Sequence, residues 1–217
     1  MSNTSHDVKL ALGADFLTAF SRLPQKQQNK VRRFLDDFTA NPSATSNNYE
    51  KIKSAKDPNI RSVRIDQDYR GIVLKPQQGN VYILLWVDKH DDAYQWAERR
   101  TCTVHPSTGT MQVVLTQEAA SEEMAAPVLT PPARQVAPAP PALFKAFTDE
   151  DLVSLGVPVT LLTHVRDIVR EEDLDRLERV LPREAFEGIF LLAAGYSVDE
   201  ARADLGMASP TSVPELS

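Results

Sequence analysis

The chain has 217 residues, of which 42% are hydrophobic and 25% charged, and its formal net charge is −6. This size and composition suit one large or two small globular domains and exclude a wholly disordered chain. A single cysteine excludes a disulfide framework. With no secretion signal and no apolar run of about 20 residues, we expect a cytoplasmic protein that does not enter a membrane.

The first predicted elements are a strand and two helices. Residues 8–12, VKLAL, are expected to form a short strand. A helix is predicted over residues 15–23, ending at Pro24, with its apolar side chains on one side: Phe16, Leu17, Phe20 and Leu23. A second helix over residues 25–39 spaces its apolar side chains at i, i+3, i+4 and i+7: Val31, Phe34, Leu35 and Phe38. Both helices are expected to cover one face of a sheet.

Three strands are predicted next, over residues 60–65, 69–75 and 81–87. Simple antiparallel hairpins, with loops at residues 66–68 and 76–80, place Arg64 opposite Arg70 and Arg70 opposite Trp86. Alternation then gives one apolar surface for the helices: Val63, Ile65, Val73, Val81, Ile83, Leu85 and Val87. The other surface is expected to stay uncovered and carries Arg64, Arg70 and Trp86, followed by Ile72, Leu74, Tyr82 and Leu84.

Two arginines opposite each other destabilise a strand pair unless something compensates the charge. Local pairing with nearby carboxylates, on Asp66, Asp68 or Asp88, is one explanation. An anion is the other, because two guanidiniums beside an indole suit a phosphate and a stacked base. Both explanations stay open. Arg61 points to the opposite face of a regular strand and joins the other arginines only through a bulge.

Three lysines precede these strands in the segment YEKIKSAKD: Lys51, Lys53 and Lys56. With the basic end of the sheet they form a candidate surface for a nucleic-acid backbone, since phosphate contacts dominate such binding. The alternative is a loop whose lysines are only solvated.

Residues 91–100 are expected to form a helix that follows His90. His90 is a candidate general acid or base, and Tyr94 lies one helical turn away. With Arg64 and Arg70 as cations, these residues meet the needs of phosphodiester cleavage without a metal. The alternative is that His90 caps the end of the strand and that Tyr94 and Trp96 pack as anchors of the helix. No second histidine or cysteine lies near Asp91 and Asp92, so neither a metal nor another cofactor is expected.

A Pro/Ala-rich segment divides the chain. Residues 1–105 carry 16 Lys and Arg against 12 Asp and Glu, whereas residues 106–217 carry 8 against 18, so the net charges are +4 and −10. We predict an interdomain linker over residues 106–142, in which TQEAASEEMA is either a frayed helix or part of the tether. A tail is expected over residues 207–217.

An acidic helical module is predicted over residues 143–206. Thr148 is the expected cap of its first helix and Gly156 the residue that closes it. Further helices are expected over residues 171–181, 183–196 and 197–205, which makes a small all-α bundle. Its acidity argues against nucleic acid and suits a protein partner, including the basic domain of the same chain.

Several segments resemble the RelE/ParE toxin superfamily, and in particular the RelE-like domain at the front of bacterial UvrD-type helicases of superfamily 1. They are KIKSAKDPNIRSVRID, YRGIVL and DKHDDAYQWAERR, and beyond the linker LFKAFTDEDLVSLGVP and LLAAGYSVDEARADL. The resemblance covers residues 8–100 most strongly and implies an α+β fold, an antiparallel sheet with two N-terminal helices. It implies basic and acid–base residues at Lys51, Lys53, Arg61, Arg64, Arg70, His90 and Tyr94.

The resemblance implies a nucleic-acid-binding module of a helicase-like protein. No GxxxxGK[ST] loop occurs in the 217 residues, so no motor activity is expected from them. The first alternative is a metal-independent endoribonuclease of RelE type. Asp91 and Asp92 argue against it, because they place negative charge beside an incoming phosphate. The second alternative is an adaptor that binds only proteins.

Overall fold

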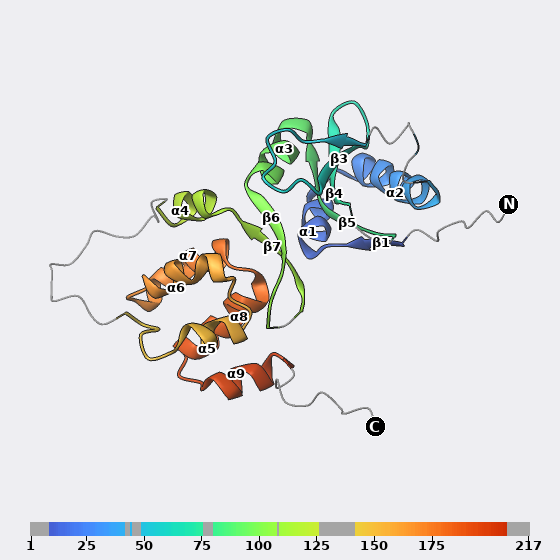
Figure 1. Ribbon diagram of the computed structural model, residues 1–217. Helices are drawn as coiled ribbons and strands as arrows, with labels where there is room; N and C mark the ends of the chain where they lie inside the picture. The colour runs from blue at the N-terminus through green and yellow to red at the C-terminus, as the bar shows by residue number, and fades with distance from the viewer. Residues whose placement is uncertain are drawn as a thin grey trace, which may run out of the picture. The chain divides into compact units, whose positions relative to one another are not determined.

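The computed structural model describes residues 9–41, 44, 49–75, 80–107, 109–125 and 142–207. The chain divides into two compact units, Met1–Arg100 and Thr101–Ser217 (Figure 1). Residues 76–79 of the predicted loop, the Pro-rich part of the expected linker and nearly all of the expected tail lie outside the described residues. No helix among the described residues has the length and apolar character needed to cross a membrane.

The first unit combines a five-stranded sheet with three helices, in the described part of the chain. Its elements are β1 (Lys9–Leu12), α1 (Ala14–Arg22), α2 (Gln25–Ala40), β2 (Glu50–Lys51), β3 (Ile60–Arg64), β4 (Tyr69–Leu74), β5 (Val81–Lys89) and α3 (His90–Glu98). The strand order is β1-β5-β4-β3-β2. The predicted strands and helices are confirmed in kind, but β1 runs parallel to β5, so the sheet is mixed.

One face of this sheet carries the core beneath α1 and α2. Buried side chains from both sides meet there, including Phe16, Phe34, Phe38, Val63, Val73, Leu84 and Val87. A bulge interrupts the pairing of β4 with β5, because Ile72 faces Trp86 whereas Val73 already faces Leu84. Leu84 and Tyr82 therefore belong to the helix-covered face, where the ring of Tyr82 meets Phe38 edge-on at 5.5 Å. The predicted facing of the first half of β5 is wrong.

The opposite face is covered by α3 (Figure 1). Ala93, Trp96 and Ala97 of α3 are buried. The Trp96 ring stacks on Trp86 with 5.3 Å between centroids and 11° between planes, and the Tyr94 hydroxyl lies 2.9 Å from Oγ of Ser62. The expectation that this surface stays open is wrong over the area where α3 lies.

The second unit is formed by a β-hairpin and six described α-helices. Its elements are β6 (Arg100–Val104), β7 (Met111–Leu115), α4 (Gln117–Ala125), α5 (Asp149–Ser154), α6 (Leu162–Arg166), α7 (Leu174–Val180), α8 (Arg183–Ala193) and α9 (Val198–Asp204). Met111–Leu115, which we expected in the linker, form β7 instead. Of the two alternatives for TQEAASEEMA, the helix is confirmed as α4. The second unit is therefore not all-α.

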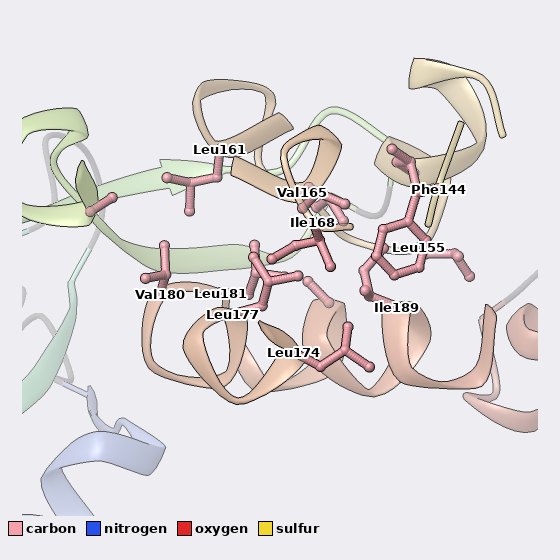
Figure 2. Packing of buried hydrophobic residues seen from close by; sticks show 14 of the residues in the cluster. Phe144, Leu155, Leu161, Val165, Ile168, Leu174, Leu177, Val180, Leu181 and Ile189 are labelled. Carbon is pink, nitrogen blue, oxygen red and sulfur yellow. The ribbon is translucent and has the colours of Figure 1, made fainter. Parts of the chain in front are cut away.

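The core of the second unit contains side chains from both the hairpin and the helices. Val114 and Leu115 of β7 and Ala120 of α4 belong to the same buried cluster as Phe144, Leu177 and Ile189, part of which Figure 2 shows. Burial of a Leu or Val side chain stabilises a fold by about 1.5–3 kcal/mol, so β7 is integral to the unit. Thr148 caps α5 with Asp151 as predicted, and Gly156 follows with φ +93°.

Candidate functional site

The N-terminal end of α3 holds a histidine and a tyrosine against each other. The backbone N–H of His90 donates to the carbonyl of Asp68 at 2.8 Å, which fixes the start of the helix to the β3–β4 loop. The imidazole stacks on the Tyr94 ring with 4.3 Å between centroids. The Tyr94 hydroxyl reaches Ser62, which is 1% exposed on β3. Arg64 lies two residues along the same strand and so on the same face.

A carboxylate fixes the orientation of the imidazole. Nδ1 of His90 lies 2.8 Å from Oδ1 of Asp91. With that carboxylate ionised, the hydrogen bond assigns the proton of the neutral ring to Nδ1 and leaves Nε2 as an acceptor. The His90 side chain is 46% exposed, so Nε2 belongs to a group that solvent reaches. Asp91, expected only as a repelling charge, is therefore a partner of the imidazole.

The two opposed arginines differ in role. The register places Arg64 opposite Arg70, as predicted. Arg64 is exposed and makes no hydrogen bond or ion pair with another described residue. Arg70 is only 8% exposed, and its Nη1 donates to the carbonyls of Asp66 (2.9 Å) and Tyr69 (3.0 Å). On β5 it faces Asp88, so the predicted pairing with Trp86 is wrong. The like-charge opposition is relieved because Arg70 turns into the loop.

The same loop is tied to α2. Oδ1 of Asp66 accepts the backbone N–H groups of Asp68 and Tyr69, and Oδ2 lies 2.5 Å from Nζ of Lys30. Burial pushes the pKa of Asp66 up, but the hydrogen bonds from Lys30 and the two amides outweigh burial and lower that pKa. The loop that accepts hydrogen bonds from Arg70 and from the backbone of His90 is thus held to α2 by a charged contact.

Three predicted binding residues lie away from Arg64 or beneath the helix. Trp86 is stacked under Trp96 and presents no free ring to a base on that side. Arg61 is opposite Val73, a residue of the face below α1 and α2, and its Nη1 donates to the carbonyls of Pro58 and Ile60. Lys51 is opposite Arg61 and shares its side of the sheet, since directly opposed side chains do so.

The remaining lysines lie at the far end of α3. Lys53 and Lys56 are exposed in the turn after β2, and Oγ of Ser54 between them donates to Oε1 of Glu98, the last residue of α3. A nine-residue helix is about 13 Å long. We call the residues along this helix the α3 surface: Lys53, Lys56, Arg64, His90 and Tyr94.

Sequence reasoning missed two members of this arrangement. Ser62 is a small polar residue that precedes Val63 in β3, and its burial requires a hydrogen-bond partner. Asp91 gave no signal in the sequence, because a carboxylate at the start of a helix is common for its own electrostatic reason. Across the described ranges, His, Cys, Asp and Glu do not gather in threes to form a metal site.

Comparisons with known proteins give likeness in fold alone. No protein-family model matches the chain, and no curated protein does. A chain of the archaeal RelE–RelB complex from Pyrococcus horikoshii OT3 is 18% identical, over 38% of this chain and 94% of that chain, with a TM-score of 0.33. A chain of the toxin–antitoxin complex RelBE2 from Mycobacterium tuberculosis is 16% identical, over 39% and 99%, with a TM-score of 0.30.

A copper-bound mutant toxin from Helicobacter pylori is 21% identical, over 39% of this chain and 97% of that chain, with a TM-score of 0.29. These structures are RelE toxins or related toxin structures, and the chain is similar to them in fold over somewhat more than a third of its length. At such scores the likeness identifies no functional residue and says nothing of a helicase.

Proposed function

We propose that the first unit is a nucleic-acid-binding module and that the α3 surface contacts the sugar–phosphate backbone. One observation carries this proposal: Tyr94 stacks on His90 and hydrogen-bonds to Ser62, two residues from the exposed Arg64. A cation without a partner among the described residues thus shares a face with an imidazole. We propose a UvrD-type helicase-like protein as the context, with the motor outside these residues.

The spacing of the cations suits an extended strand. Lys53 and Lys56 flank Ser54, which contacts the last residue of α3, and Arg64 lies two residues from Ser62, which Tyr94 of α3 contacts. The helix itself is about 13 Å long. If three phosphates are contacted, a plot of the logarithm of the binding constant against the logarithm of the salt concentration should have a slope of about −2 for a single strand. Protein contacts made through apolar groups show no such slope.

The test is fluorescence anisotropy with the full chain. Labelled 12-nucleotide single-stranded RNA, single-stranded DNA and duplex are titrated from 50 to 300 mM salt. Arg64→Ala is expected to weaken binding and lower the slope by roughly 0.7. Arg33→Ala is the matched control, because Arg33 is exposed on α2, across the sheet from α3. Equal losses from both variants, or no salt dependence, contradict the proposal.

Metal-independent endoribonuclease activity is the second candidate, favoured by the hydrogen bond between His90 and Asp91. In this reaction Nε2 of His90 accepts the proton of a 2′-hydroxyl, the O2′–P bond forms and the P–O5′ bond breaks. Arg64 offsets the charge on phosphorus oxygens. The leaving 5′-oxygen takes a proton from water or from the Tyr94 hydroxyl, which Ser62 holds at 2.9 Å.

Cleavage is tested on labelled RNA in excess EDTA. His90→Gln keeps a polar side chain but removes the base and is expected to abolish cleavage while leaving binding within about threefold. RNA that stays intact with the unaltered chain contradicts this candidate and leaves the binding proposal standing.

A protein partner is the third candidate. The Pyrococcus horikoshii and Mycobacterium tuberculosis structures are toxin–antitoxin complexes. The second unit of this chain belongs to a half with net charge −10, which disfavours nucleic acid and suits a protein. An adaptor is expected to leave the labelled RNA and DNA unbound at every salt concentration, whereas a nucleic-acid module binds them with the salt slope given above.

A further inference from the structure

Aromatic side chains are exposed at the C-terminal end of α8. Phe190 is 54% exposed and Tyr196 47%. The Phe190 ring lies 6.3 Å from that of Phe186, one turn earlier. The N–H of Tyr196 donates to the carbonyl of Leu191, so the chain turns back against the last turn of the helix. Phe186 is partly buried against the core of the unit. We call Phe190 and Tyr196 the α8 aromatic surface.

The rest of the unit fixes which side of α8 faces outward. Ala185, Gly188, Ile189 and Leu192 are buried in the core. A Cβ at Gly188 would lie 3.0 Å from Cβ of Leu155, so this side is in close contact. Phe190 lies two residues from Gly188, about 200° round the helix. Rotation that buries Phe190 would expose the core side, so this ring stays outside unless a partner covers it.

The segment that carries these aromatic residues is acidic, with a net charge of −3 over residues 183–204. Residues 183–204 contain five carboxylates, on Glu184, Glu187, Asp199, Glu200 and Asp204, against two arginines, Arg183 and Arg202. Arg183 is bound to Glu187 at 2.9 Å. Hydrogen bonds from the backbone and side chain of Ser197 lower the pKa of Glu200, so its carboxylate stays ionised well into acid. The α8 aromatic surface thus lies in a negative field.

The negative charge of this region decides which class of molecule can bind the α8 aromatic surface. Nucleic acid and an anionic bilayer are repelled by a half-chain of net charge −10, and a second copy of the unit brings the same charge again. We propose that the α8 aromatic surface docks a cationic amphipathic segment of another protein. Its apolar side chains cover Phe190, and its Lys or Arg side chains meet the carboxylates and the exposed ring faces.

The test uses a synthetic 15-residue Leu/Lys amphipathic helix as the probe and a Leu/Glu helix as its control. Amide shifts of the ¹⁵N-labelled full chain map the contact. The Leu/Lys helix is expected to shift the amide signals of α8 and of the start of α9. Phe190→Ser is expected to weaken the binding of this helix about tenfold. Val159 is 60% exposed and lies outside α8 and α9, so Val159→Ser is expected to leave the binding of the Leu/Lys helix unchanged.

Three outcomes overturn the inference. Shifts spread evenly over the acidic segments, with no effect of Phe190→Ser, indicate charge attraction alone. If the Leu/Glu helix binds as tightly as the Leu/Lys helix, the charge of the segment does not select what binds. Sedimentation of a dimer that Phe190→Ser dissociates identifies a second copy as the occupant. Thermal unfolding by circular dichroism verifies that both variants fold, which the exposure of both side chains leads us to expect.

Discussion

The hydroxyls of Ser62 and Tyr94 lie 2.9 Å apart, although 32 residues separate them in the chain. Ser62 belongs to β3, and Tyr94 belongs to α3. The bond therefore joins the strand that carries Arg64 to the helix that carries His90. Any function that needs both groups depends on this contact.

Ser62→Ala is expected to lower the free energy of unfolding of the first unit by about 1 kcal/mol, the usual worth of one hydrogen bond. The chain has two tryptophans, Trp86 and Trp96, and both lie in the first unit. Their fluorescence during urea unfolding therefore reports on that unit. The double variant Ser62→Ala with Tyr94→Phe should lose little more free energy of unfolding than either single variant. Fully additive losses would mean that the two hydroxyls do not interact.

Arg70→Ala and Arg64→Ala are expected to separate stability from binding. Arg70 donates to loop carbonyls from a buried position, so its loss should cost about 2 kcal/mol. Arg64 is exposed, so its loss should change stability by less than about 0.5 kcal/mol. Urea unfolding measures both, and strand binding should fall for Arg64→Ala. A stable Arg70→Ala variant would show that the loop does not need the guanidinium.

Asp66 is expected to make the first unit less stable in acid. Its pKa is lowered in the folded state, so its contribution is complete above the unfolded pKa of about 4 and is lost as the pH falls through the folded value. Asp66→Asn should therefore flatten the fall in stability below about pH 4. Asp36→Asn, an exposed carboxylate on α2, is the control. Identical pH profiles for Asp66→Asn and the unaltered chain would contradict the role of Lys30 and the two amides.

The sequence predicted those parts of the first unit whose pattern is strictly periodic. The helices over residues 15–23 and 25–39 have clear apolar stripes, and the three-residue loop after Ile65 correctly set Arg64 opposite Arg70. The bulge in β5 could not be seen, because VYILLWV is apolar at nearly every position and one extra residue leaves no mark on such a run. The predicted facing of the side chains in the first half of β5 was therefore reversed.

The role of the candidate site stays a prediction, but the arrangement of its residues differs from the expected one. His90 stacks on Tyr94, which reaches the strand of Arg64. The guanidinium of Arg70 is bound to loop carbonyls, and Trp86 is stacked under Trp96. The apolar stripe of Ala93, Trp96 and Ala97 was the available signal that α3 covers this part of the sheet.

The hairpin of β6 and β7 was missed because its short strands contain polar residues such as Thr and Gln. The side chains of His105, which follows β6, and of Gln112 are buried and bonded to the carbonyls of Val157 and Gly156.

That hairpin leads to a prediction about where the second unit begins. Nε2 of His105 lies 3.3 Å from the carbonyl of Val157, and Nε2 of Gln112 donates to that of Gly156 at 2.9 Å. Val114, Leu115 and Ala120 add apolar contacts to the same core. A fragment of residues 101–217 is therefore expected to unfold cooperatively on heating. A fragment of residues 143–217 should lack a cooperative transition, because it loses several buried side chains worth about 1.5–3 kcal/mol for each Val or Leu.

Circular dichroism melting and amide shift dispersion distinguish the two fragments. The variant Gln112→Leu in the longer fragment serves as a graded control, since it leaves the apolar contacts and removes the bond to the Gly156 carbonyl, at a cost of about 1–3 kcal/mol. Equal cooperativity of the two fragments would restore a boundary near residue 143 and make β7 and α4 an appendage. Cooperative unfolding of the longer fragment alone makes the hairpin a structural part of the acidic unit, because only then do its buried side chains belong to the folding core.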